Sequence, residues 1–156
     1  MWTGSHLDTP PDGGMFDGAL GVVAGLDAAA AIGAGSLRRT IAVVARLEEG
    51  CRFGRGVFGS RAMVGDIKPD EGDLLDADGV SVAEAFAELG LGPLPTRCWA
   101  DHPPPACFVE THIEQGPALA AAGAPLGVVT SIAGMAGFDV VFSGSRGRAP
   151  GTTPRS

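Results

Sequence analysis

The run TIAVVARLEEG, residues 40–50, decides the fold that the sequence predicts. Its first six residues, 40–45, are mostly apolar and rich in β-branched side chains, which is typical of a strand buried in a parallel sheet. The run then turns polar and ends at Glu48-Glu49-Gly50, where a loop should begin. The sequence therefore predicts a short buried strand that delivers two adjacent carboxylates to its carboxyl end.

The residues before this strand predict a helix. Over residues 18–33, Leu20, Val23, Leu26 and Ala30 recur at helical spacing although the segment contains four glycines. Glycine is unfavourable inside a helix, so its repeated use suggests that the helix packs closely against another element. We expect that element to be the sheet.

Further patterns extend the same order along the chain. Helical patterns cover residues 57–64 and 81–89, and strand patterns cover residues 107–113, 125–132 and 138–142. In the second helical pattern, Ser81 and Glu84 have the spacing of a capping box. Helices in these positions would cover the sheet that the strands form.

The arrangement of these elements predicts the fold class and the domains. Strands and helices alternate over residues 1–114, which indicates an α/β layered domain with a mostly parallel sheet and flanking helices. The end of the chain departs from that order, because two strand patterns follow one another without a helix. We therefore expect a first domain over residues 1–130, with residues 131–156 beginning a second, incomplete one.

Composition and charge limit the class of partner. The 156 residues carry a formal net charge of −7, whereas nucleic acids and anionic membranes attract proteins with an excess of Lys and Arg. Acidic side chains suit metal cations better. The sequence contains no run of 18 apolar residues and no signal-peptide pattern at its start. We expect a cytoplasmic protein that binds neither nucleic acid nor membrane.

Polar clusters lie at the ends of the predicted strands or in the loops after them, where open α/β sheets place their sites. They are Ser5-His6-Leu7-Asp8, Phe16-Asp17-Gly18, Glu48-Glu49-Gly50 and residues 110–116, Glu-Thr-His-Ile-Glu-Gln-Gly. Taken singly, each is more often a turn or a solvated face than a site. Together they supply the His, Asp and Glu donors that zinc and similar ions prefer in catalytic sites.

The order and wording of these clusters resemble the M20 family of dinuclear-metal peptidases and amidohydrolases. The matching segments are GSHLDT (4–9), GGMFDGALG (13–21), EEGCRF (48–53), GSR (59–61), ETHIEQGP (110–117) and GVVTSIAG (127–134). The run HIEQGP is similar to the branch that contains N-carbamoyl-amino-acid hydrolases and allantoate amidohydrolases. The resemblance therefore implies a metal-dependent hydrolase of linear amide or ureido C–N bonds, acting on a small molecule.

The resemblance also implies a centre with two divalent metal ions. In such a centre, His6 is a ligand of one ion and Asp17 bridges both. Glu49 is a ligand of one ion, and His112 binds at the other end of the pair. Histidine and carboxylate ligands accept zinc, manganese, cobalt and nickel alike, so the sequence leaves the metal open.

Three further residues receive roles from the same resemblance. Glu48 corresponds to the general base that takes a proton from water, and Asp8 to the carboxylate that fixes the tautomer of the first histidine. Consecutive side chains after a strand point in different directions, which suits a division of tasks between Glu48 and its neighbour. Gln115 is a candidate contact of the substrate, with a structural amide as the alternative.

Departures from the family pattern set the remaining expectations. Family chains are much longer, and Ala149 and Met135 stand where a histidine and a glutamine are usual. We expect a partial chain with little or no hydrolase activity alone that retains part of a metal site. The alternatives are a non-catalytic remnant or metal-binding module, and an unrelated α/β interaction domain whose carboxylates are surface charges. The family is homodimeric, but a dimer does not follow here.

Overall fold

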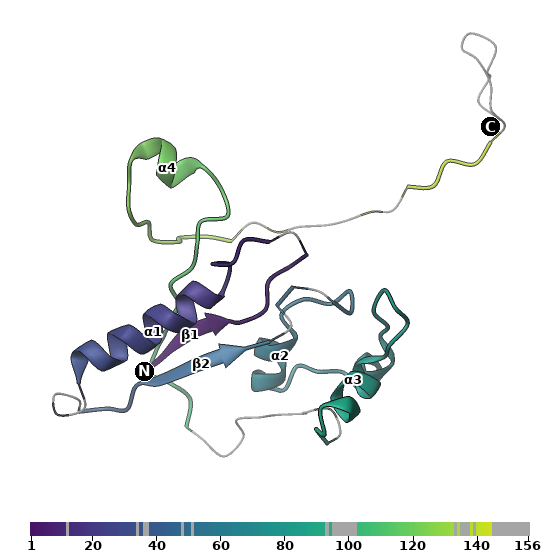
Figure 1. The fold of residues 1–156 in the computed structure, drawn as a ribbon, viewed down its shortest axis with the longest axis horizontal. Coiled ribbons are helices and arrows are strands. Elements are labelled where there is room, and N and C mark those ends of the chain that lie inside the picture. The colour runs from purple at the N-terminus through teal and green to yellow at the C-terminus, as the bar shows by residue number, and fades with distance from the viewer. Residues whose placement is uncertain are drawn as a thin grey trace, which may run out of the picture. The chain divides into compact units, whose positions relative to one another are not determined.

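The computed structural model describes residues 1–11, 13–33, 35, 38–47, 49–50, 52–92, 94, 103–132, 134, 138 and 140–144. Its elements, in chain order, are β1 (Trp2–His6), α1 (Ala19–Ile32), β2 (Ala42–Arg46), α2 (Phe58–Val64), the 3-10 helix η2 (Pro69–Asp73), α3 (Val82–Glu88), β3 (Phe108–Val109) and α4 (Ala118–Ala122) (Figure 1). Contacts divide the chain into two compact units, Met1–Ala118 and Leu119–Ser156, which are described separately.

A parallel sheet of three strands, in the order β2-β1-β3, organises the first unit. Strand β1 is central and pairs with β2 from Trp2 opposite Ala42 to His6 opposite Arg46. The strand predicted over residues 40–45 is therefore present with nearly the expected bounds. The parallel arrangement brings the carboxyl ends of β1 and β2 to one edge of the sheet, as the α/β prediction requires.

Helix α1 lies along the sheet, as Figure 1 shows, and its glycines allow this close approach. A Cβ atom at Gly21 would lie 2.2 Å from the carbonyl oxygen of Thr111 and 2.7 Å from the Cβ atom of Ser5. Any side chain there would push the helix away from the strands. Among the helices of the described residues, α1 is the longest at 14 residues, and none is long and apolar enough to cross a membrane.

Helices α2 and α3 pack around an apolar cluster. Its buried members are Phe53, Phe58, Ala62 and Val82. The rings of Phe58 and Phe86 meet edge to face at a centroid distance of 5.9 Å. The predicted capping box starts α3: Ser81 Oγ accepts the Glu84 N–H at 3.2 Å, and Glu84 Oε2 accepts the Ser81 N–H at 2.8 Å. This cap satisfies two backbone donors at the start of the helix.

A buried carboxylate connects the segments next to this cluster by hydrogen bonds. Glu71 on η2 is only 1% exposed. Its Oε1 atom accepts hydrogen bonds from Arg61, from Arg55 Nη1 at 2.9 Å and from the Lys68 N–H at 3.1 Å. The hydrogen bond from Arg61, above all, holds the pKa of the Glu71 carboxyl below its ordinary value, against the effect of burial.

Three strand predictions were wrong in extent or existence. The strand expected over residues 107–113 is reduced to β3, and residues 125–132 form no strand. The described residues of 138–142 form none either. Apolar side chains in these segments, such as Val128 and Phe142, are almost fully exposed. A short apolar run has strand propensity, but a strand also needs a hydrogen-bonding neighbour, and the described residues of 125–132 and 138–142 pair with none. The domain boundary expected after residue 130 stays a prediction.

Candidate metal centre

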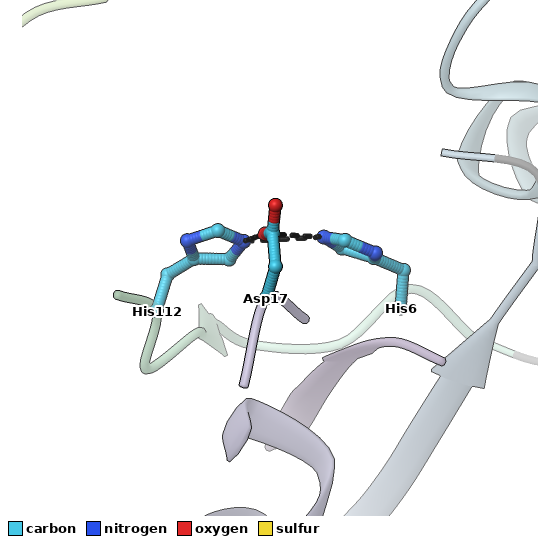
Figure 2. A group of neighbouring side chains, drawn as sticks. All are labelled: His6, Asp17 and His112. Atoms are coloured by element: carbon cyan, nitrogen blue, oxygen red, sulfur yellow. Dashed lines mark hydrogen bonds and ion pairs between the residues drawn. The ribbon is translucent and has the colours of Figure 1, made fainter. Parts of the chain in front are cut away.

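Three side chains from separate parts of the first unit converge at the edge of the sheet (Figure 2). The Nε2 atom of His6 lies 3.1 Å from the Nε2 atom of His112. The Oδ1 atom of Asp17 lies 3.2 Å from His112 Nε2 and 3.7 Å from His6 Nε2. His6 and Asp17 are buried, whereas the His112 side chain is 28% exposed. The cluster is therefore enclosed on the protein side and open to solvent at one histidine.

The register of the sheet explains why two histidines so distant in sequence meet. Trp2 pairs with Phe108 in the ladder between β1 and β3. The same offset, continued beyond the last ladder pair, sets His6 opposite His112. Parallel strands thus carry both imidazoles toward the carboxyl edge of the sheet, where sites of open α/β folds are found.

A tight turn before α1 places the carboxylate. The Asp17 N–H donates to the carbonyl oxygen of Gly14 at 2.9 Å, and Gly18 follows with a positive φ of 76°. A Cβ atom at Gly18 would lie 2.3 Å from Nδ1 of His6. Only glycine fits between the turn and the imidazole ring, because it combines the left-handed conformation with the absence of a side chain.

Hydrogen bonds to backbone carbonyls set the tautomer of each histidine. His6 Nδ1 lies 2.6 Å from the Asp8 carbonyl oxygen, and His112 Nδ1 lies 2.9 Å from that of Ile113. A carbonyl accepts only, so each Nδ1 carries the proton and donates it. Each Nε2 then presents a lone pair, and Asp17 Oδ1 receives no hydrogen bond. Three acceptor atoms face one another without a donor between them.

Such an arrangement fits a cation at its centre. Around a tetrahedral zinc ion with bonds of about 2.0–2.1 Å, neighbouring ligand atoms are about 3.3–3.4 Å apart. The three separations here, 3.1, 3.2 and 3.7 Å, bracket that value. A proton on one imidazole would also relieve the repulsion, but it would leave the third acceptor unsatisfied. The donor set and spacing of His6, Asp17 and His112 therefore suit a divalent metal ion.

Gln115, the predicted substrate contact, lies against the carboxylate of this cluster. Its Nε2 atom donates to Asp17 Oδ2 at 3.0 Å. Gln115 also has a positive φ of 56°, which is uncommon for a residue other than glycine. The contact fixes the orientation of Asp17, which agrees with the structural alternative, and the role of Gln115 as a substrate contact stays a prediction.

Asp8 acts on His6 through its backbone rather than through its carboxylate. The carbonyl oxygen of Asp8 accepts the imidazole proton, while its carboxylate Oδ1 is 3.9 Å from Nδ1, beyond hydrogen-bond distance. Asp8 Oδ2 instead accepts the Gly50 N–H at 3.0 Å. In this structure the tautomer is set by the carbonyl oxygen, and the role expected of the Asp8 carboxylate stays a prediction. The carboxylate links the loop after β1 to the loop after β2.

The adjacent glutamates are the part of the predicted site that the cluster does not contain. Glu48 lies outside the described residues. Glu49 is half-buried in the loop after β2, but the close group of ligand atoms contains only His6, Asp17 and His112. Three of the four predicted ligands thus meet, and the roles assigned to both glutamates stay predictions.

Known proteins with similar sequences are hydrolases of one kind. The chain is 43% identical over 157 residues to N-carbamoyl-L-amino acid amidohydrolase of Geobacillus stearothermophilus, covering 98% of this chain and 38% of that protein. It is 39% identical over 155 residues to allantoate amidohydrolase of Bacillus subtilis, covering 97% and 37%. This chain is an amidohydrolase homologue. No model of a protein family matches the sequence.

The amidohydrolase homology includes the fold. A crystal structure of a hydantoinase/carbamoylase family amidase from Burkholderia ambifaria matches with a TM-score of 0.64 and 34% identity. The match covers 78% of this chain and 30% of that one. The resemblance to the carbamoylase and allantoate branch, and the partial α/β fold, are therefore confirmed. The chain covers between 30% and 38% of the length of these relatives.

Sequence reasoning missed a polar network in this amidohydrolase homologue. Glu110 accepts a short hydrogen bond from Ser5 Oγ through Oε1 and another from Arg46 Nη2, at 2.9 Å, through Oε2. The Arg46 guanidinium also lies over the Phe108 ring, 5.1 Å from its centroid. In the sequence, Glu110 and Ser5 are members of polar clusters whose other residues carry the metal-ligand pattern. Their positions beside the two histidines were the available signal.

Proposed function

We propose that this chain carries the metal-binding part of an amidohydrolase that cleaves linear C–N bonds in ureido or amide compounds, such as N-carbamoyl amino acids or allantoate. One observation supports it above the rest: three acceptor atoms, from His6, Asp17 and His112, converge without a donor among them. The names of the homologues support the substrate class.

The resemblance sets His112 at the other end of the metal pair from His6, but their Nε2 atoms are 3.1 Å apart. We therefore assign His6, Asp17 and His112 as ligands of one divalent ion and Glu49 as a ligand of a second. Asp17 is suited to bridge, since Oδ1 faces the histidines while Oδ2, which accepts one hydrogen bond from Gln115, retains a second lone pair. Zinc, manganese, cobalt and nickel all accept this donor set.

A divalent ion at this centre would polarise a carbonyl group and lower the pKa of a water molecule. The residues of the chain then have separate tasks. Glu48 would accept the proton that this water releases, which requires a carboxylate within hydrogen-bond reach of it. Asp8 keeps the His6 lone pair directed at the cluster and ties the loop that bears Glu49 to the loop after β1.

Metal stoichiometry tests the assignment directly. The full chain would be loaded with Zn²⁺ or Mn²⁺, dialysed and subjected to elemental analysis, alongside Asp17→Asn and the control Asp27→Asn, an exposed residue of α1. Retained metal in the wild type and the control, with loss in Asp17→Asn, is the expected result. Absence of retained metal from the wild type would refute the proposal.

A metal-binding module without hydrolytic turnover is the second candidate. Its support is that, among the described residues, the close group of ligand atoms contains His6, Asp17 and His112 but not Glu49. Assays of the metal-loaded chain with an N-carbamoyl amino acid and with allantoate separate the two candidates. Turnover that a chelator and Glu48→Gln both abolish supports the enzyme, and retained metal without turnover supports the module.

The environment of the chain forms part of the same proposal. A small-molecule substrate, and neither nucleic acid nor membrane, agrees with the net charge of −7. A cytoplasmic location agrees with the absence of a membrane-spanning helix among the described residues. A homodimer, as in the family it resembles, is left to a measurement of molecular mass in solution.

A further inference from the structure

The backbone pairing between β1 and β3 ends before it reaches the histidines. The ladder consists of Trp2 opposite Phe108 and Thr3 opposite Val109. His112 lies three residues beyond the last ladder pair, yet its Nε2 atom is only 3.1 Å from that of His6. Backbone hydrogen bonds of the ladder therefore do not hold the segment that carries His112 against β1 at this point.

Beyond the last ladder pair, side-chain hydrogen bonds connect the segment after β3 to the other two strands. Glu110 bonds to Ser5 on β1 and to Arg46 at the end of β2, so one carboxylate joins all three strands of the sheet. Ser5 is fully buried and immediately precedes His6. Glu110 precedes His112 by two residues. Each of the two histidines therefore lies within two residues of a side chain that takes part in the Ser5–Glu110–Arg46 hydrogen bonds.

We infer that Glu110 is a positioning residue that sets the separation of His6 and His112, and with it the geometry of a metal ion bound between them. This inference rests on the proposed function. The two carboxylate oxygens act on different strands: Oε1 holds β1 through Ser5, and Oε2 holds β2 through Arg46. Loss of the carboxylate would free the segment after β3 from both.

A purely structural ion pair would behave differently. The Glu110 side chain is 28% exposed, and ion pairs that solvent reaches contribute little to stability. Removal of Glu110 would also leave the buried Ser5 hydroxyl without its acceptor, so some loss of stability is expected whichever role Glu110 has. Groups that orient metal ligands, in contrast, commonly change metal affinity by about 10–100-fold when they are replaced. Metal affinity, rather than stability, distinguishes the two roles.

Cobalt is the probe of choice because its visible absorption reports the number and geometry of its ligands. The full chain and the variants Glu110→Ala, Glu110→Gln and Ser5→Ala would be titrated with Co²⁺ against a competing chelator. Circular dichroism would verify folding. Glu84→Gln is the matched control, since Glu84 also accepts a serine hydroxyl, that of Ser81, but caps α3. Asp17→Asn serves as the ligand-loss reference.

We expect Co²⁺ affinity to fall about 10–100-fold in Glu110→Ala, with an altered spectrum. Glu110→Gln should lose less, because its amide oxygen still accepts from Ser5, and Ser5→Ala should be intermediate. Wild-type affinity and spectrum in Glu110→Ala would overturn the inference, provided Asp17→Asn abolishes binding. Should Glu110→Ala fail to fold, the same result with Ser5→Ala would overturn it. A wild-type chain that binds no Co²⁺ would refute the proposed function and this inference together.

Discussion

Two buried carboxylates of the first unit, Asp17 and Glu71, occupy opposite electrostatic surroundings. Glu71 Oε1 faces only donors, from two arginines and a backbone N–H, and its pKa is lowered as a result. Asp17 Oδ1 faces two imidazole lone pairs and receives no hydrogen bond. Glu71 Oε2 and Asp17 Oδ1 both lack a hydrogen bond, so the difference lies in the neighbours of each carboxylate. Arginine donors surround Glu71 and stabilise the fold, whereas two imidazole lone pairs face Asp17 and suit a cation.

Replacement of Asp17 should change metal affinity more than any other substitution considered for these two carboxylates. In Asp17→Asn, metal affinity should fall by more than about a hundredfold, beyond the loss typical of groups that merely orient ligands. The metal-free stability should stay unchanged or rise, because an amide NH₂ can donate to His112 Nε2. Competition titration and urea unfolding of the metal-free chain measure the two quantities. A marked loss of metal-free stability would contradict this account of Asp17.

The complementary change is Glu71→Gln, which should lower the free energy of unfolding by about 2–4 kcal/mol because it leaves two arginines without their buried carboxylate. Metal affinity should stay the same. Asp66→Asn is the matched control: Asp66 also pairs with Arg61 but is 67% exposed, and its loss should cost less than about 0.5 kcal/mol. Equal effects of the two substitutions in urea unfolding would show that burial is not what matters.

The contribution of Glu71 to the free energy of unfolding should also depend on pH. The folded pKa of Glu71 is below its unfolded value, chiefly through Arg61, so its stabilising contribution is complete above the unfolded pKa. It is lost as the pH falls through the folded pKa. The difference in unfolding free energy between wild type and Glu71→Gln should therefore be constant near neutrality and shrink below about pH 4.5. A difference that grows on acidification would reverse the sign of the argument.

The smallest expected effect is local to α3. Ser81→Ala removes the side chain that caps this helix and should lower stability by about 1 kcal/mol, without any change in metal binding. Thermal unfolding of the metal-free chain provides the measurement. Ser81→Asn, which preserves a capping oxygen, should restore most of the loss. Failure of that rescue would mean that the serine matters for packing rather than for the cap.

Local sequence patterns predicted the elements that neighbouring residues determine. The strand at residues 40–45, the helix over residues 18–33 and the capping box of Ser81 and Glu84 depend on spacing within a few residues. The strands expected at residues 125–132 and 138–142 failed because their existence depends on a pairing partner, which a linear pattern does not contain.

In the candidate site too, the sequence identified individual residues but not the contacts between distant segments. Resemblance identified His6, Asp17 and His112, which the structure brings together. It did not give the contacts of polar groups that have several possible partners: Asp8 uses its carbonyl on His6, and the Gln115 amide turns to Asp17. The network around Glu110 was also out of reach, because its members come from three distant segments and only the sheet register makes them neighbours.

The short ladder between β1 and β3 has a consequence for the order of folding. His6 and His112 are 106 residues apart, so their meeting closes a long loop late, after the local contacts of α1 and β2 have formed. An ion that joins them in the folded chain would stabilise it through its own binding free energy, because the unfolded chain does not hold the two histidines together. Binding of metal would then reinforce the two ladder pairs and the Glu110 hydrogen bonds that already attach β3 to the sheet.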